Sequence, residues 1–425
     1  MVDVRPFRAI RYTENAGDLK SLLTQPYDKI DAAMQEAYYS LSPYNYCRLI
    51  LPMEPNRYQV VQQRIQQWLT KHVLAKDDEP SIFVCREIFT LNGEVHTRTG
   101  LITALRMYAY SENMVFPHET TYAAPKTDRL NMLRAVEKDL EPVFLIYSDP
   151  EGVTVKLLAE LTEAVPIVDV EDSFNVKHQV WRVTDQQKIA QLRKALEPKP
   201  LVITDGHHRY ESALAFRDEK RQEGAWAADS AFNFHMSMLV PVQDAGLMVL
   251  PTHRLLKSQK LTTNALEALK QYFTVQEIPI SVNNLDGFLE IHRSEHAFCV
   301  YDGKHAYGLL LKHEEHVYEF VSARASKETK LFDVVILRDV IFKAIMKTGD
   351  LKMEEDILFV RWTKTAVEKV DSGEASIAFL VNPISPAIVW QLAQQHERLP
   401  EKSTDFYPKT VSGLMMMDIS AGEKV

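Results

Sequence analysis

A run of ionisable residues follows a short apolar segment near the middle of the chain. Thr204-Asp205-Gly206-His207-His208-Arg209 comes directly after Leu201-Val202-Ile203 and leads into the apolar residues of 213–216. This order predicts a strand, a tight turn at Gly206 and a helix that begins near His207. The first turn of a helix presents unpaired backbone N–H groups and the positive end of the helix dipole. The segment therefore predicts an anion site, with phosphate as the natural ligand.

The side chains of the turn fit this interpretation. Asp205 ends the strand, and Gly206 tolerates the positive φ that such a turn often needs. Arg209 falls in the first helical turn, where a cation is unfavourable unless it faces an anion, and its planar fork suits phosphate. A capped helix with surface histidines is the ordinary alternative. His207 and His208 diverge by about 100° on a helix, and no HExxH or HxH spacing is present, so a metal-dependent hydrolase is the weaker hypothesis.

Three further segments carry residues suited to phosphate chemistry. In Pro26-Tyr27-Asp28, the carboxylate of Asp28 is either a general base or the cap of a helix predicted near Lys29. Glu119 is a second candidate base, and Lys126 lies in the same polar loop. The ordinary explanation for these charged residues is that the loop is exposed to solvent. Lys402-Ser403-Thr404 is cationic and rich in hydroxyls, but it lacks the glycine-rich cradle of a P-loop. A solvated segment is the ordinary explanation there too.

The chain length and the order of its elements predict two domains. The 425 residues exceed what one ordinary core accommodates. We place the boundary between residues 245 and 246, so that 1–245 carries the phosphate-binding turn and 246–425 forms a second α/β domain whose 402–404 segment returns to the site. Asn92-Gly93 predicts a hairpin between neighbouring strands. Alternating strands and helices predict a mixed α/β fold overall.

Composition and charge exclude several classes of function. The chain has 49 basic and 58 acidic residues and a net charge of −9, which argues against a nucleic-acid partner. Its three cysteines show no CxxC spacing, so we expect reduced, buried thiols. No apolar stretch approaches the roughly 20 residues of a membrane span, and residues 1–7 lack the apolar core of a signal peptide. We expect a cytoplasmic protein; its oligomeric state stays open.

Motifs along nearly the whole chain, from about residue 3 to 418, resemble the bacterial and archaeal family called domain of unknown function 1015. They are Val4-Arg5-Pro6-Phe7-Arg8-Ala9, Gly17-Asp18-Leu19, Pro26-Tyr27-Asp28, His118-Glu119, Asp205-Gly206-His207-His208-Arg209-Tyr210-Glu211, Pro251-Thr252-His253-Arg254, Lys402-Ser403-Thr404 and Phe406-Tyr407-Pro408-Lys409. Gln25 and Leu399 replace the proline and the methionine that the family often has at these places. Neither change removes a candidate catalytic group.

The turn itself is similar to a shorter pattern of the ParB/sulfiredoxin superfamily. Asp205-Gly206, Arg209 and Ala213 match its D-G-x-x-R-x-x-x-A spacing. The resemblance implies a ParB/sulfiredoxin-like nucleotide-binding core in which Asp205, Gly206, His207, His208 and Arg209 contact phosphates. It implies ATP, ADP or CTP as the nucleotide, with Mg²⁺, and phosphotransfer or phosphohydrolysis on a small polar substrate, as in free-serine kinases. Asp28 or Glu119 would be the general base, His208 or His207 the acid/base or a phosphate donor contact, and Arg209 would counter charge in the transition state. Lys126, Lys402, Ser403 and Thr404 would be further phosphate contacts. A nucleotide-sensing protein without turnover is the alternative.

Overall fold

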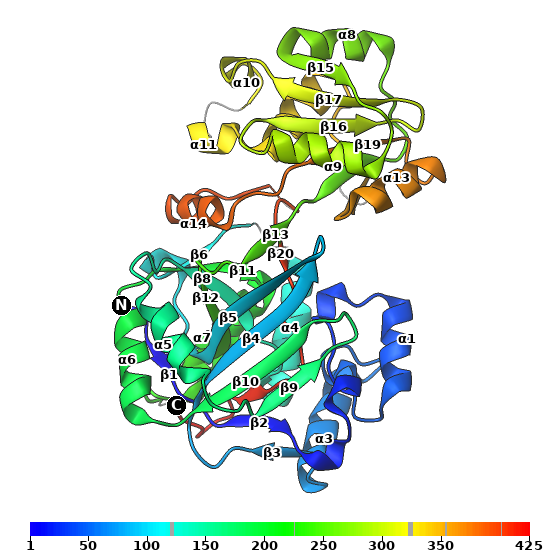
Figure 1. The fold of residues 1–425 in the computed structure, drawn as a ribbon. Helices are drawn as coiled ribbons and strands as arrows, with labels where there is room; N and C mark the ends of the chain where they lie inside the picture. Colours follow the sequence, from blue (N-terminus) through cyan, green and yellow to red (C-terminus); the bar gives the residue numbers. More distant parts are fainter. Residues whose placement is uncertain (120–122, 225, 322–325, 353–354, 401) are drawn as a thin grey trace. The chain divides into compact units, whose positions relative to one another are not determined.

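The computed structural model describes residues 1–119, 123–224, 226–321, 326–352, 355–400 and 402–425. They form two compact units: unit 1 is Met1–Met248 with Pro408–Val425, and unit 2 is Val249–Tyr407. The sequence-based division assigned residues 246–425 to one domain, whereas Pro408–Val425 packs in unit 1. The physical reason is β21 (Met416–Asp418), which pairs with β2 (Ala9–Tyr12) and β7 (Lys138–Asp139). The blue start and the red end of the chain thus meet in one sheet (Figure 1).

The main sheet of unit 1 has nine strands among the described residues, in the order β6-β11-β8-β12-β5-β4-β10-β9, with β1 beside β5. The bounds are β1 Val4–Arg5, β4 Ile82–Leu91, β5 Glu94–Arg106, β6 Val115–Pro117, β8 Val143–Tyr147, β9 Val168–Glu171, β10 Lys177–Val183, β11 Leu201–Asp205 and β12 Phe234–Pro241. The predicted hairpin is confirmed, since β4 and β5 pair antiparallel across Asn92-Gly93.

The predicted strand–turn–helix is also confirmed. Strand β11 is buried throughout, runs parallel to β6 and antiparallel to β8, and ends at Asp205. Its register against β8 shifts between Ile203 and Asp205, an irregularity of the kind that redirects the following side chain. Helix α7 (His207–Glu223) begins one residue after Gly206 and packs against α4 (Ala123–Val136). The turn is thus held between a buried strand and a packed helix.

The remaining elements of unit 1 cover the sheet and its smaller partner. The four-stranded sheet has the order β3-β2-β21-β7, with β3 at Leu74–Lys76. The other helices are α1 Ala32–Leu41, α2 Cys47–Ile50, α3 Arg57–Thr70, α5 Val153–Leu161 and α6 Gln186–Leu196, with short 3-10 turns η1 Glu14–Ala16, η2 Leu19–Ser21, η3 Tyr27–Lys29, η4 Tyr110–Glu112 and η5 Ala231–Asn233. Cys47 and Cys85 are buried free thiols.

Unit 2 is built on a six-stranded sheet in the order β15-β17-β16-β19-β14-β18. Its strands are β14 His253–Leu256, β15 Phe273–Glu277, β16 Ala297–Tyr301, β17 Ala306–Leu311, β18 Ile357–Val360 and β19 Ile377–Val381; β13 Met248–Leu250 and β20 Asp405–Tyr407 pair separately. Its helices are α8 Thr263–Tyr272, α9 Val282–Ile291, α10 Glu315–Tyr318, α11 Lys327–Lys330, α12 Asp333–Val335, the π-type η6 Ile336–Ile345, α13 Thr363–Asp371 and α14 Pro386–Gln394. None of the helices described in either unit is both long and apolar enough to span a bilayer.

Candidate functional site

The turn between β11 and α7 requires glycine for two reasons. Gly206 has φ +88°, in the left-handed region that L residues rarely adopt. A Cβ built there would lie 2.9 Å from Nε of Arg209. The arginine therefore folds back against the turn, close to the backbone of Gly206. Glycine also has no side chain, so this N-cap residue does not cap the first N–H groups of α7.

Asp205 and Arg209, both predicted to contact phosphate, point into the protein. Nη2 of Arg209 lies 2.6 Å from Oδ2 of Asp205, and Nζ of Lys409 lies 3.0 Å from Oδ1 of the same carboxylate. Nη1 of Arg209 donates to the carbonyl of Pro142. Burial opposes ionisation of Asp205, but Lys409 and Arg209 outweigh it and hold the pKa of the carboxyl well below its usual range. These three side chains form a charged support beneath the turn.

Glu141, which the sequence did not suggest, connects this support to the loop of Asp28. The carboxylate is buried, and its Oε1 accepts hydrogen bonds from the backbone N–H of Tyr27 (3.1 Å) and the hydroxyl of Ser412 (2.8 Å). Burial raises the pKa of Glu141, while the nearby charges of Arg209 and Arg129 oppose the rise. The only signal in the sequence was a charged residue next to Pro142 and a fully apolar strand.

Asp28 lies near enough to His208 and Arg209 to act on both by its charge. It belongs to η3, and α1 is capped instead by Asp31, whose Oδ1 accepts from the N–H of Met34 at 2.8 Å. The interpretation of Asp28 as a helix cap is therefore wrong. The negative charge of Asp28 is close enough to raise the pKa of Arg209 and to oppose the lowered pKa of His208. The structure thus brings the Pro26-Tyr27-Asp28 motif to the turn.

His207 is buried against His118. The two rings are 4.8 Å apart, and the backbone N–H of His118 donates to Nε2 of His207 at 3.4 Å. Burial, with the neighbouring His118, lowers the pKa of His207 to about 3, so the ring is neutral at physiological pH. Glu119 lies beside the same pair, with Oε1 3.5 Å from Nε2 of His118. Nε2 of His207 thus contacts the backbone of the 118–119 loop, and a role of His207 as acid or base stays a prediction.

His208 is half-buried and surrounded by charged groups. Burial lowers the pKa of His208, and the positive charges of Lys126 and Arg209 lower it further. The negative charges of Glu211 and Asp28 oppose this shift. Nζ of Lys126 pairs with Oε2 of Glu211 at 2.9 Å, one helical turn further along α7. The alternative of a side-chain-capped helix with surface histidines does not describe this helix start. The predicted residues of unit 1 thus gather around the beginning of α7.

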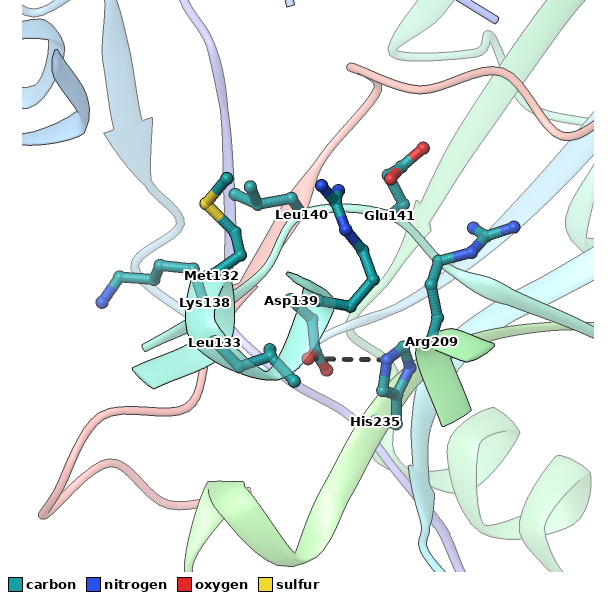
Figure 2. A pocket seen from close by; sticks show the side chains of 9 residues that line it. Met132, Leu133, Lys138, Asp139, Leu140, Glu141, Arg209 and His235 are labelled. Atoms are coloured by element: carbon teal, nitrogen blue, oxygen red, sulfur yellow. Dashed lines mark ion pairs between the residues drawn. The ribbon is translucent and has the colours of Figure 1, made fainter. Parts of the chain in front are cut away.

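A pocket opens beside Arg209 (Figure 2). Its volume of about 40 Å³ leaves room for roughly three water molecules, far less than a nucleotide needs. His235 and Asp139 line it, with Nε2 3.6 Å from Oδ1. Nδ1 of His235 contacts the carbonyl of Met236 at 2.7 Å, so Nδ1 is the nitrogen that carries the hydrogen. Burial raises the pKa of Asp139, whose Oδ1 is buried without a hydrogen-bond partner among the described residues.

The third predicted phosphate segment lies in unit 2. Lys402 is exposed with φ +56°, and the hydroxyl of the buried Ser403 donates to the carbonyl of Pro400. The participation of Lys402, Ser403 and Thr404 in the site of unit 1 stays a prediction. Within the part of the chain that is described, no three His, Cys, Asp or Glu side chains are grouped as a metal site would require.

The chain matches the family model described as "Protein of unknown function (DUF1015)" over residues 4–335. No curated protein matches it. Similar solved structures include a free serine kinase in complex with AMP (13% identity, 72% of this chain and 88% of that chain, TM-score 0.35) and SbnI with a C-terminal truncation from Staphylococcus aureus (10% identity, 72% and 84%, TM-score 0.33). These TM-scores are too low to carry a functional argument. Because the family model covers most of the sequence, the chain belongs to the DUF1015 family.

Proposed function

We propose that unit 1 binds a nucleotide through its phosphates at the start of α7 and transfers or hydrolyses a phosphoryl group. The observation that carries the proposal is a helix start with a glycine N-cap that follows a buried strand and has two buried cations, Arg209 and Lys409, packed beneath it. Backbone N–H groups and the helix dipole favour an anion there. The resemblance of the turn to ParB/sulfiredoxin-like proteins supports the nucleotide, with ATP, ADP and CTP as candidates.

The buried cations act through their charge rather than by direct contact. Arg209 is 7% exposed and is bonded to Asp205 and the carbonyl of Pro142. Asp205 is shared by Arg209 and Lys409, so one carboxylate pairs with two cations and holds both beneath the turn. Such a fixed, preorganised field is what stabilises the negative charge of a phosphoryl transition state. Direct phosphate contacts fall to the first N–H groups of α7 and to His208.

The two predicted bases have different neighbours at the turn. Asp28 lies near His208 and Arg209, and Glu119 lies near His118 and His207. We assign the general base to Asp28, because a substrate hydroxyl beside the first turn of α7 would face the side where His208 is half-exposed. Glu119 is then a positioning residue of the 118–119 loop. A Mg²⁺ ion bound with the nucleotide would neutralise phosphate charge, and the nearby carboxylate of Asp28 is chemically suited to it.

Titration calorimetry with ADP, ATP and CTP in the presence of Mg²⁺ tests the proposal. We expect at least one nucleotide to bind with a Kd well below about 1 mM, and His208→Gln to weaken binding about tenfold. His305→Gln, an exposed histidine of unit 2, is the control and should bind as the unchanged protein does. If no nucleotide binds more tightly than about 1 mM, the proposal fails.

Phosphate release distinguishes the enzyme from the sensing alternative. In the proposed enzyme, Asp28→Asn retains nucleotide binding and loses turnover by about 10²–10⁴-fold, the contribution of a positioned base. Binding without product release from the unchanged protein, over hours and with candidate hydroxyl substrates present, would instead identify a nucleotide-sensing protein.

A further inference from the structure

The sheet of unit 2 contains a buried arginine whose hydrogen-bond partners, among the described residues, are backbone carbonyls. Arg254 lies on β14 and is 6% exposed. Its Nη1 donates to the carbonyl of Thr252 at 2.7 Å, and its Nη2 donates to the carbonyl of Lys402 at 3.2 Å. A guanidinium has five N–H donors and a permanent charge. Among the described residues, no carboxylate lies within ion-pair distance of Arg254.

The surroundings of Arg254 make its buried charge still less favourable. Its neighbours across the sheet are Phe359 on β18 and Phe379 on β19, and its guanidinium lies 5.7 Å from the ring centre of Phe359. Burial, with the repulsive charge of Arg338, lowers the pKa of Arg254 to about 10, and the group still remains charged at neutral pH. Arg338 itself is neutralised by Asp339 at 2.7 Å and offers no compensation.

Other buried arginines of this chain have a carboxylate. Arg98 is bonded to Glu87 at 2.6 Å, and Arg209 is bonded to Asp205 at the same distance. A buried ion without a counterion is costly, because desolvation is not offset by a nearby opposite charge. An oxyanion bound against the free edge of the guanidinium would remove this cost at Arg254 and would fit its planar fork.

We propose that Arg254 is the centre of an anion-binding site in unit 2 that takes a small oxyanion, a phosphate or carboxylate group. The 402–404 segment borders the site, since the carbonyl of Lys402 is held by the guanidinium. This assigns the Pro251-Thr252-His253-Arg254 motif to ligand recognition and gives unit 2 a ligand of its own. The site does not depend on nucleotide binding at the start of α7.

Hydrogen exchange of the full chain, with and without millimolar inorganic phosphate or acetate at constant ionic strength, tests this site. We expect exchange at 253–256 and 402–404 to slow by at least about fivefold with one of the two anions. The protection should vanish in Arg254→Met and persist in Arg338→Met, the control for a general loss of positive charge. Arg254→Lys, which keeps a point charge without the fork, should retain weakened protection.

The stability of Arg254→Met provides a second readout. Without anions, this variant should unfold at the same or a higher denaturant concentration than the unchanged protein, because an uncompensated charge is removed. A structural role for Arg254 predicts the opposite, a lower midpoint and no effect of anions on the unchanged protein, and that result overturns the proposal. Protection at 205–210 reports separately on the start of α7, so failure of one site is distinguishable from failure of the other.

Discussion

Two buried arginines, one in each unit, differ in how the fold compensates their charge. Arg209 of unit 1 is bonded to Asp205 and lies near Glu141, and these charges raise its pKa against the effect of burial. Arg254 of unit 2 has two carbonyl partners, and burial lowers its pKa. The first charge is neutralised within the fold. The charge of Arg254 has no counterion among the described residues, and we propose that a bound anion supplies it.

The difference determines how each arginine should be studied. Removing a partner of Arg209 leaves an uncompensated buried charge and damages the structure, so activity lost in such a variant is ambiguous. Removing the charge of Arg254 relieves a cost. The residues to vary for function in unit 1 are therefore the half-buried His208 and the exposed Asp28, and not Arg209.

Asp205→Asn would make Arg209 resemble Arg254, and we expect the largest effect of all from it. Arg209 and Lys409 would both lose their anion, which should lower the free energy of unfolding by about 3–5 kcal/mol. Urea unfolding measures this. Asp169→Asn is the control, because its pair with Lys177 is exposed and should contribute less than about 1 kcal/mol. Equal effects of the two substitutions would show that Asp205 does not stabilise the fold by compensating the charges of Arg209 and Lys409.

Each unit also contains a buried neutral histidine, and acid should destabilise both. Burial lowers the pKa of His207 and of His253 to about 3, below the roughly 6.5 of an unfolded chain. The unfolded state therefore binds a proton first as pH falls. Stability is full above about pH 6.5 and is lost progressively toward pH 3, by about 2–4 kcal/mol per histidine.

Unfolding at pH 7 and pH 4.5 for each variant measures this loss. His207→Gln and His253→Gln keep an acceptor for the N–H of His118 and of Val381 and cannot be protonated. Each should reduce the difference between the two pH values relative to the unchanged protein. A difference that stays the same would show that these histidines are already charged in the folded state.

Gly206→Ala tests whether the position of Arg209 depends on the turn. A Cβ at Gly206 adds left-handed strain and meets Nε of Arg209 at 2.9 Å, and that side chain is held by Asp205. Gly152 is the matched control, since it has φ +66° before α5 and a Cβ there meets nothing within 4 Å. We expect losses of about 2 kcal/mol for Gly206→Ala and about 1 kcal/mol for Gly152→Ala. Identical losses would mean that only backbone strain matters.

The local structure of the turn could be predicted from the sequence because its causes are local. An apolar run, a glycine and the polar residues after it define a strand, a turn and a helix start within 201–216. The hairpin at Asn92-Gly93 is predictable for the same reason. The direction of Arg209 is not, because it depends on Pro142 and Lys409, which are distant in sequence.

The long-range partners had no signal of their own in a single sequence. Glu141 and Lys409 look like ordinary charged residues next to prolines, and they become part of the support only when β8 and the end of the chain fold against β11. The inclusion of Pro408–Val425 in unit 1 has the same origin, since three residues of β21 pairing with β2 carry no periodic pattern. Asp28 was expected at the site or at a helix cap, and only the fold could decide between them.

The smallest effect concerns two partly exposed lysines that pair with carboxylates. Lys126 pairs with Glu211 of α7, and Lys220 of the same helix pairs with Glu137 and Glu223. Replacing either lysine by alanine should change stability by about 1 kcal/mol or less, because ion pairs that are open to solvent contribute little. Only Lys126→Ala should weaken ADP binding, by roughly two- to fivefold, because only that charge acts on His208. Calorimetry on both variants decides this, and an equal loss in both would mean that the nucleotide responds to net charge rather than to the first turn of α7.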